Sequence, residues 1–411
     1  MSKIFISQLH INKLLSINDT SIDVSNSQLK HLIITGKNGS GKTMLLNSIM
    51  DFFRFDCYEA PHVQKNLDDR LYLRDKLNIG KLDHKEQKKI KSKYDEVFSR
   101  TSDVFRTLEV HMIPSMDESF TLVESGKAIF TMFSANRRVD MLIPKNPIKP
   151  SFVHGSSFIK DHKQSKEFVK FLVDLKVQEA LARNEGEIKE ADKIRDWFTS
   201  FTDLLKRLFE DQYLKLNFDF RTYQFTIHSE DKVFGFNELS DGYSAVIDII
   251  ADLILAMQNE DGSLNGIYDK PGIVLIDEVE THLHLKLQKE IMPFLTTVFP
   301  NIQFIVTTHS PFVLSSLDNA VAYDLEKKQK LTDLQEYSYE SLTEGYFKVK
   351  TESSYLGLKL KRVEELLKLE TKDKAQDREL KELIELFDNL NHAVTPDNVI
   401  AKYNKLLLRY L

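Results

Sequence analysis

The order of apolar and polar residues along the chain predicts alternating strands and helices. Residues 3–12 and 20–24 alternate apolar and polar side chains, which predicts two antiparallel strands that each bury one face. Three later runs, 32–35, 272–276 and 302–308, are almost entirely apolar, as in strands that are covered on both faces of a parallel sheet. Because helical segments separate these buried strands, we expect an α/β fold.

Further segments complete this outline. Shorter strand-like runs lie at residues 107–113, 120–124, 128–133, 214–220 and 224–228. Residues 60–105 are highly charged and helical in character, and residues of about 155–212 show the helical i, i+3, i+4, i+7 spacing with a turn at 184–186, which predicts an inserted helical hairpin.

The chain is expected to divide into two regions. We expect one domain over residues 1–325 and a helical region over 326–411. The apolar stripes of the second region need a surface to bury against, which could be the parent domain, a second copy or another protein.

Composition narrows the class of protein. Of 411 residues, 42% are hydrophobic and 29% charged, which is typical of a globular chain with a real core. The single cysteine, Cys57, excludes an internal disulfide and a cysteine-rich metal site, and it fits a reducing cytoplasm. We expect no membrane span, because no stretch approaches about 18 consecutive apolar residues. The formal net charge of −6 argues against general coating of nucleic acid, although a local basic groove stays open.

A glycine-rich loop follows the first buried strand and precedes a helix. The loop fits the pattern G-x-x-x-x-G-K-[ST], in which small residues let successive backbone N–H groups surround a phosphate. We expect Lys42 to reach the β- and γ-phosphates of ATP and Thr43 to bind Mg²⁺. The predicted phosphate-binding residues are Gly36, Lys37, Asn38, Gly39, Ser40, Gly41, Lys42 and Thr43.

Three later positions carry complementary chemistry. Ser240 and Gly242 lie in a second loop at a helix start, where they could face an anion, although this loop alone is a weak signal. Asp277 ends a buried strand and could hold Mg²⁺, and Glu278 could polarise the attacking water. His309 ends the next buried strand, where it could contact the γ-phosphate.

Other candidates have two interpretations. The lysines from Lys81 to Lys93 could contact phosphates, but interleaved acids favour a solvated helix face. Arg137 and Arg138 follow a strand and could touch phosphate or a facing subunit, or lie in a surface loop. His282 and His284 could suggest zinc, but their spacing lacks further ligands.

Taken together, four motifs resemble those of the ABC-class ATPases in the family's order. Residues 36–43 resemble the Walker A loop, 239–242 the signature loop, 273–278 the Walker B strand with its catalytic glutamate, and His309 the switch histidine. Residues 277–284 and 307–311 resemble the SMC and RecF branch, and most of all the stand-alone ATPases of prokaryotic anti-phage systems, which include PtuA-like Septu ATPases, AriA-like PARIS ATPases and the ATPase half of OLD-family nucleases.

The resemblance implies a mechanism and a fold. It implies an ABC-type ATPase domain with an antiparallel β subdomain, the helical insertion and a C-terminal helical appendage. Two subunits would clamp ATP and Mg²⁺ head to tail, so that Lys42 and Thr43 of one chain face Ser240 and Gly242 of the other. Glu278 would activate water and His309 would sense the γ-phosphate. The family's glutamine loop has no clear counterpart, and residues 136–138 could occupy that region.

The leading hypothesis is a cytoplasmic, oligomeric ATPase of an anti-phage system that controls a separate nuclease or toxin. We find neither a TOPRIM nor a His-Asn-His nuclease motif in residues 326–411, while residues 337–347 and the helices after them resemble the tail of PtuA-like ATPases. The alternatives are a RecF-like or SMC-like ATPase that clamps DNA for repair, and a binding switch in which ATP-driven association matters more than turnover.

Overall fold

The computed structural model divides into two compact units, Met1–Gln335 and Glu336–Leu411. It describes residues 3–56, 63–78, 83–101, 105–137, 140–151, 164–230, 232–258, 264, 268–332, 334, 341–342, 354–369, 371–389 and 397–410. Lys81, Arg138 and most of residues 337–347, for which the sequence carries predictions, lie outside these ranges.

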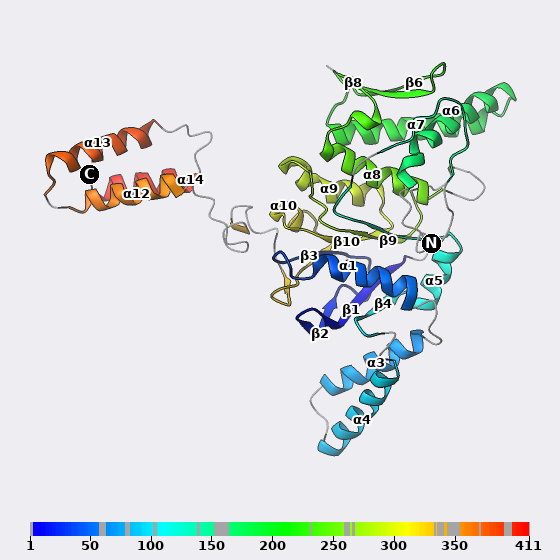
Figure 1. Ribbon diagram of the computed structural model, residues 1–411, viewed down its shortest axis with the longest axis horizontal. Coiled ribbons are helices and arrows are strands. Elements are labelled where there is room, and N and C mark those ends of the chain that lie inside the picture. The colour runs from blue at the N-terminus through cyan, green and yellow to red at the C-terminus, as the bar shows by residue number, and fades with distance from the viewer. Residues whose placement is uncertain are drawn as a thin grey trace. The chain divides into compact units, whose positions relative to one another are not determined.

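A mixed six-stranded sheet lies at the centre of the first unit (Figure 1). Its strand order is β12-β11-β3-β10-β9-β5, and all neighbours are parallel except the β11–β12 pair. The strands are β3 (His31–Thr35), β5 (Ile129–Phe133), β9 (Gly272–Ile276), β10 (Ile302–Thr307), β11 (Ala320–Asp324) and β12 (Gln329–Leu331). The three apolar runs therefore form adjacent buried strands, as predicted.

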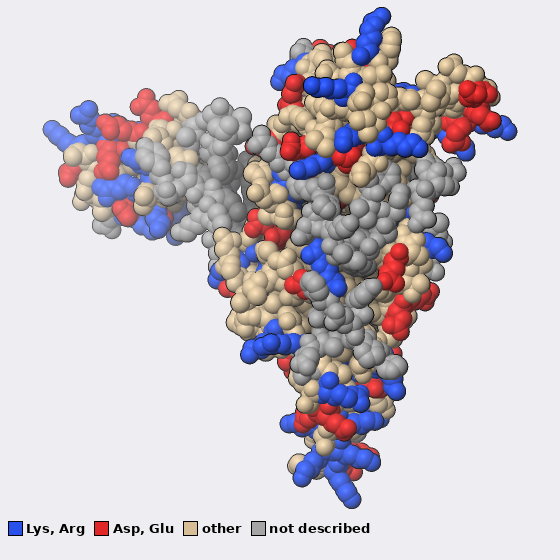
Figure 2. Space-filling model, turned by 45° about the vertical axis from the view of Figure 1, so that its right-hand side comes forward, with Lys and Arg blue, Asp and Glu red and all other residues tan. Residues whose placement is uncertain are grey.

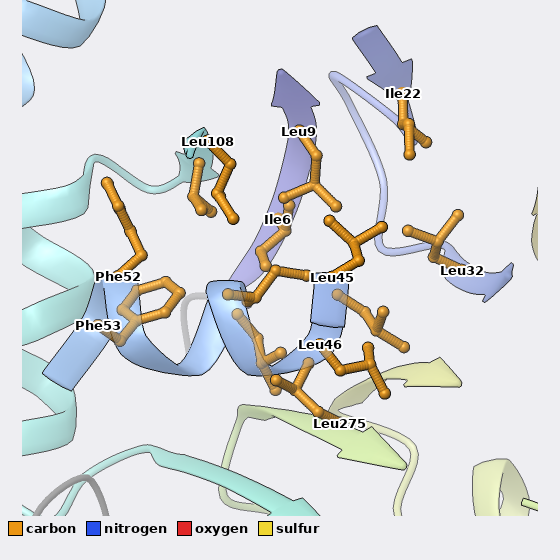
Figure 3. Close-up of a cluster of buried hydrophobic side chains, with 14 of the residues drawn as sticks. Ile6, Leu9, Ile22, Leu32, Leu45, Leu46, Phe52, Phe53, Leu108 and Leu275 are labelled. Atoms are coloured by element: carbon orange, nitrogen blue, oxygen red, sulfur yellow. The ribbon is translucent and has the colours of Figure 1, made fainter. Parts of the chain in front are cut away.

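A second, antiparallel sheet packs against one face of the central sheet. Its order is β2-β1-β4, formed by β1 (Phe5–Leu14), β2 (Ile17–Asp23) and β4 (Leu108–Ile113). Helix α1 (Lys42–Asp51) lies between the two sheets, and Leu45, Leu46 and Ile49 are fully buried there against Leu32 and Leu275 (Figure 3). This core holds the start of α1, and with it the glycine loop, in place.

The opposite face of the central sheet is covered by helices (Figure 1). They are α8 (Asp241–Ala256), α9 (Leu285–Val298) and the short α10 (Pro311–Leu314). Beyond them lie the helical hairpin α6 (Phe168–Asn184) and α7 (Ile188–Phe209), and the antiparallel sheet of β6 (Lys215–Asp219), β7 (Gln224–His228) and β8 (Val233–Phe234). Short turns η1 (Phe52–Asp56), η2 (Gln164–Glu167) and η3 (Phe236–Glu238) connect elements of this unit.

The aromatic residues of the α6–α7 hairpin are packing residues. Trp197 stacks on Phe201 with ring centroids 5.4 Å apart and meets Phe171 edge-on at 5.6 Å. All three side chains are buried. The predicted helical hairpin is confirmed, and its aromatics stabilise the contact between its two helices.

One predicted strand is wrong. Residues 120–124 belong to helix α5 (Met116–Glu124). Ser115 caps this helix by accepting a hydrogen bond from the Glu118 N–H at 3.3 Å, and Asp117 and Glu118 lie in its first turn, where the helix dipole favours acids. These start signals outweigh the strand-like composition of the five residues.

A second helical hairpin follows α1. It consists of α3 (Val63–Asn78) and α4 (His84–Arg100), and it projects from the antiparallel sheet (Figure 1). The prediction of helices in this charged region is confirmed.

The second unit is a three-helix assembly. Its helices are α12 (Ser354–Leu367), α13 (Lys374–Asp388) and α14 (Asp397–Tyr410). Val363, Leu366, Leu383 and Phe387 are buried in a common core, and Phe387 stacks on Tyr403 at 4.8 Å. The expectation that these stripes need an external surface was wrong, because the three helices bury them against one another.

Candidate functional site

The glycine loop lies at the carboxyl end of β3. Gly36, Gly39 and Gly41 have positive φ angles of 144°, 80° and 97°. At Gly36 a side chain would also collide with Ser40, because an added Cβ would lie 2.8 Å from its Oγ. These residues must therefore be glycine for the loop to curl and expose its N–H groups toward an anion.

Lys42 folds back over this loop. Its Nζ donates hydrogen bonds to the carbonyl oxygens of Gly36 at 2.9 Å and Lys37 at 3.2 Å. Burial lowers the pKa of Lys42, while the negative charges of Glu278 and Asp277 raise it. The ammonium group thus spans the inside of the loop, where a phosphate bound by the N–H groups would meet it.

The carboxylate of Asp277 joins the glycine loop to the neighbouring strands. The Thr43 hydroxyl donates a hydrogen bond to its Oδ2 at 2.8 Å, and the Thr307 hydroxyl donates one to its Oδ1 at 2.6 Å. Thr43 and Asp277 were predicted to share a cation, and their oxygens are adjacent. A hydroxyl and a carboxylate are ligands that suit Mg²⁺, which would take the remaining positions from water and phosphate.

Glu278 lies in the turn directly after this strand. It has a left-handed backbone with φ of 44°, which is uncommon for a non-glycine residue and is typical of functional sites. The Glu278 N–H donates to Thr307 Oγ1 at 2.7 Å, and the carboxylate accepts a longer bond of 3.3 Å from the Thr281 hydroxyl. The side chain is half-buried, so it can both reach the site and meet water.

Arg137 holds the Asp277–Glu278 turn by hydrogen bonds to its backbone. Only 2% of the residue is exposed, and its guanidinium donates to the backbone oxygens of Asp277 at 2.7 Å and Glu278 at 2.8 Å. Both earlier interpretations of Arg137, a phosphate or subunit contact and a surface loop, are therefore wrong. The buried fork of N–H donors instead orients the turn that carries the two acids.

His309 is close to the same acids. Its backbone N–H donates to the Glu280 carboxylate, and Ser310 is held by a 2.7 Å bond from its hydroxyl to Gln288. Burial lowers the pKa of His309, and the nearby charge of Lys42 lowers it further. The neutral imidazole that results can donate one hydrogen bond to a phosphate oxygen.

The loop with Ser240 and Gly242 begins α8. Ser240 is exposed and makes no side-chain cap, whereas Gly242 is buried against the turn after Glu278. A Cβ on Gly242 would lie 2.9 Å from the His282 carbonyl oxygen, so only glycine fits there. The next residue, Tyr243, stacks on Phe209 at 4.4 Å and meets His284 edge-on at 6.3 Å.

The site residues thus come from one edge of the central sheet. Lys42, Thr43, Asp277, Glu278 and His309 converge there, while Gly242 contacts the turn after Glu278 at His282. Sequence reasoning missed Thr307, Glu280 and the role of Arg137. A signal existed only for Thr307, which directly precedes the motif Thr308-His309-Ser310 at a strand end.

One protein-family model matches part of the chain. Residues 115–315 match the protein family described as "AAA domain, putative AbiEii toxin, Type IV TA system". The matched residues include Asp277, Glu278 and His309, and the glycine loop precedes them.

Short segments of the chain also resemble curated proteins. A 109-residue segment is 40% identical to "Septu protein PtuA" of Bacillus mycoides (strain KBAB4), covering 25% of this chain and 15% of that protein. A 95-residue segment is 44% identical to "Retron Ec83 probable ATPase" of Escherichia coli, covering 23% of this chain and 17% of that protein. The matches thus span less than a fifth of either relative.

A solved structure covers more of the chain at lower similarity. It is an SMC head bound to the C-winged helix domain of ScpA, with a TM-score of 0.40 and 11% sequence identity over 81% of this chain and 100% of that chain.

Proposed function

We propose that this protein hydrolyses ATP with Mg²⁺ at the site formed by the glycine loop, Asp277, Glu278 and His309. The contact between the Thr43 hydroxyl and the Asp277 carboxylate carries the proposal, because it joins the two groups that a phosphate-bound cation requires. When bound, Mg²⁺ would neutralise charge on the phosphates.

Each residue of the site has a separate role in the proposed reaction. The loop N–H groups and Lys42 hold the phosphates, and Lys42 exchanges its hydrogen bonds with the loop carbonyls for bonds to phosphate. Glu278 accepts a proton from the attacking water, while Arg137 and Thr307 keep the Glu278 backbone in place. The neutral His309 donates a hydrogen bond to the terminal phosphate.

We further propose that two copies bind ATP between them. Ser240 is exposed at the start of α8 and is free of a capping bond, so it can face the nucleotide of a second copy. The site is incomplete without such a copy, because the second phosphate-facing loop would come from the partner. Because Gly242 closely contacts His282, a shift of the α8 start on binding of the second copy would also shift the turn with Glu278.

The biological role that fits best is an antiviral defence ATPase that controls a separate nuclease or toxin. The resemblance of short segments to a Septu protein and a retron ATPase supports this role. The three-helix unit supports it too, because it is a folded module on the same chain that can serve as the docking site for an effector. The site of action would be the cytoplasm. No helix among the described residues has the length and apolarity needed to cross a bilayer.

The decisive experiment compares Glu278→Gln with Lys42→Ala. Glu278→Gln should bind ATP normally, lower kcat by about 10²- to 10⁴-fold and trap an ATP-dependent dimer in size-exclusion chromatography. Lys42→Ala should lose ATP binding and dimer formation together. Unchanged turnover in Glu278→Gln would show that another group acts as the base.

The effector can then be identified with the trapped variant. A tagged Glu278→Gln chain, purified from its host with ATP, should retain a stoichiometric nuclease or toxin. Recovery of nucleic acid without any protein partner would contradict the effector role.

A further inference from the structure

The α3–α4 hairpin carries a lysine face that the ATPase site does not use. Figure 2 shows many basic side chains, with acidic ones among them, at the end of the first unit formed by this hairpin. The residues concerned are Lys85, Lys88, Lys89 and Lys93 in the first part of α4, and all four are exposed. We call them the α4 lysine face.

Helix geometry places these lysines on one side. At about 100° per residue, Lys85, Lys89 and Lys93 follow one another at i, i+4 intervals, and Lys88 lies beside them. Ile90 and Tyr94, which are half-buried, lie on the other side of α4. The lysine face therefore points away from the side by which the helix packs.

Two exposed acids lie beside these lysines on the helix, because Glu86 precedes Lys89 by three residues and Glu96 follows Lys93 by three. Among the residues that the structure describes, neither acid forms an ion pair with any of the four lysines. Asp83 is engaged at the helix start, where its carboxylate accepts hydrogen bonds from the N–H groups of Lys85 and Glu86, each at 2.8 Å. The prediction of a solvated helix face therefore stays open, and so does the alternative that the lysines contact phosphates.

Like charges at i, i+4 repel each other and destabilise a helix. The lysine face contains two such pairs, Lys85–Lys89 and Lys89–Lys93, in a chain whose formal net charge is −6. An external polyanion would remove this repulsion. The face has no aromatic or apolar anchor of the kind that a protein partner needs, which favours a ligand recognised through charge alone.

The spacing suits a nucleic-acid backbone. Lys85 and Lys93 are eight residues apart, which corresponds to about 12 Å along a helix. A DNA strand places a phosphate about every 3.4 Å along the duplex axis, so this length faces about three to four phosphates.

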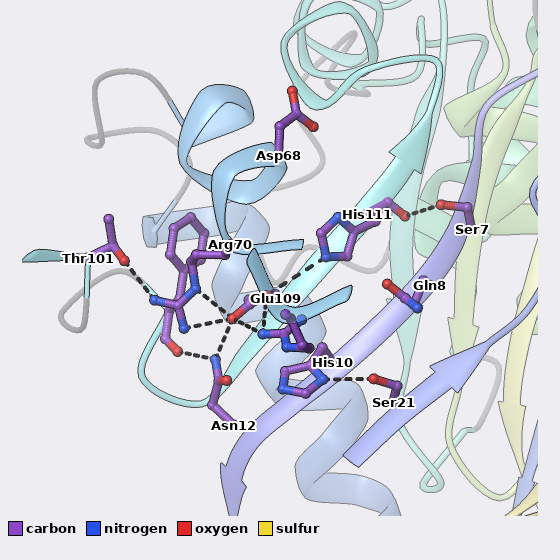
Figure 4. Close-up of polar contacts among 12 residues, drawn as sticks. Ser7, Gln8, His10, Asn12, Ser21, Asp68, Arg70, Thr101, Glu109 and His111 are labelled. Atoms are coloured by element: carbon purple, nitrogen blue, oxygen red, sulfur yellow. Dashed lines mark hydrogen bonds and ion pairs between the residues drawn. The ribbon is translucent and has the colours of Figure 1, made fainter. Parts of the chain in front are cut away.

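The hairpin is also firmly attached to the ATPase domain (Figure 4). Arg70 and Arg74 of α3 donate to the buried Glu109 carboxylate of β4 at 2.7 and 2.9 Å, and Asn12 of β1 donates to it at 3.0 Å. Burial alone would raise the pKa of Glu109, but His111 and the two arginines outweigh it and hold the pKa well below its usual range. These contacts therefore fix the hairpin to the antiparallel sheet that packs on α1.

We propose that the α4 lysine face binds the phosphate backbone of duplex DNA without reading its sequence. The face supplies four mobile ammonium groups and no bidentate donor suited to a base edge, so affinity should depend on salt and little on sequence. This proposal is independent of the ATPase chemistry.

The test uses the full chain and two matched variants. In the first, Lys85, Lys88, Lys89 and Lys93 are all replaced by glutamine, which has a similar helix propensity. In the control, four exposed lysines elsewhere in the same unit are replaced in the same way, which changes the net charge equally: Lys127, Lys145, Lys189 and Lys215. Binding of a fluorescent 30-base-pair duplex is followed by anisotropy over a range of salt concentrations.

Wild type and control should bind with a steep salt dependence, and the lysine-face variant should bind at least tenfold more weakly. Its slope of log K against log salt should be smaller by about 0.9 for each lost phosphate contact. Equal binding by both variants would overturn the proposal, and so would equal affinity of the wild type for polyglutamate, which would indicate an acidic protein partner. Circular dichroism and ATP turnover without DNA confirm that each variant is folded, and they separate this proposal from the ATPase proposal.

Discussion

At the scale of single residues, Thr307 links the cation ligand to the proposed base. Its one hydroxyl donates to Asp277 and accepts from the Glu278 N–H. Neither acid can move without breaking a bond to this buried side chain. The Asp277 carboxylate and the Glu278 backbone are thus held by a neighbouring strand as well as by their own.

Replacing Thr307 with valine removes both hydrogen bonds and keeps the side-chain shape. We expect kcat to fall at least tenfold with little change in the Kd of ATP, because the glycine loop is untouched. Stability should fall by about 1–3 kcal/mol, since the Glu278 N–H loses its partner. Phosphate release and binding of a fluorescent ATP analogue measure the two effects. Thr296→Val, which removes only a hydroxyl bonded within α9, is the control and should keep full kcat.

Gly242 tests the contact between the α8 start and the Glu278 turn. Gly242→Ala places a Cβ 2.9 Å from the His282 backbone oxygen, so one of the two segments must shift. We expect ATP binding to persist while turnover and ATP-dependent dimerisation fall at least tenfold. Gly235→Ala is a suitable control, because the nearest atom to its Cβ would be 4.0 Å away. Normal dimerisation of Gly242→Ala would contradict the proposed role of this loop.

At the scale of elements, the order of strands assembles the site. Strand β10 lies between β3 and β9, so Thr307 at its end is adjacent to both the glycine loop and Asp277. Parallel strands present their carboxyl ends at one edge, which is why residues from three distant segments converge there. The antiparallel β2-β1-β4 sheet has a different role, because Glu109 of β4 anchors the α3–α4 hairpin to it.

The Glu109 anchor makes a strong prediction for stability. Glu109→Gln leaves Arg70 and Arg74 buried without a counter-charge, and such a loss typically destabilises a protein by about 3–5 kcal/mol. We expect a clearly lower denaturation midpoint in urea. Glu118→Gln, an exposed change on α5, should leave the stability within about 0.5 kcal/mol of the wild type. Equal stability of the two variants would show that the anchor is dispensable.

At the scale of the whole molecule, two buried histidines make stability depend on pH. Burial lowers the pKa of His31 to about 4, and burial together with the charge of Arg74 lowers that of His10 to about 4. His31 Nδ1 accepts a 3.1 Å hydrogen bond from the Phe304 N–H, which requires the neutral ring.

Because the unfolded chain binds these protons near pH 6.5, the folded state loses stability as the pH falls from about 6.5 to 4. The loss should be on the order of a few kcal/mol per histidine. Urea unfolding at several pH values between 7 and 4 measures it. The His31→Gln variant should be less stable at pH 7, and its free energy of unfolding should change less with pH than that of the wild type. An unchanged slope of this free energy against pH would show that His31 does not contribute.

Patterns along the chain were enough to predict the candidate site residues and most of the helices and strands. Apolar runs identified β3, β9 and β10, and the helical period identified the α6–α7 hairpin, whereas residues 60–105 were predicted only as helical. The glycine loop was recognisable because its backbone shape requires glycine at defined spacings. The sequence pattern wrongly predicted a strand at residues 120–124, where capping by Ser115 favours a helix. It also failed for Arg137, whose charge suggested the surface.

Which residues contact one another became clear from the three-dimensional arrangement of the strands and helices. The burial of Arg137, the double role of Thr307 and the anchoring of α3 by Glu109 all depend on strand order and on contacts between residues far apart in the chain. A local pattern records the period and composition of a segment, and it carries no information on its neighbours in space. The three-helix unit shows the same limit, because its apolar stripes predicted burial while only the fold showed that they cover one another.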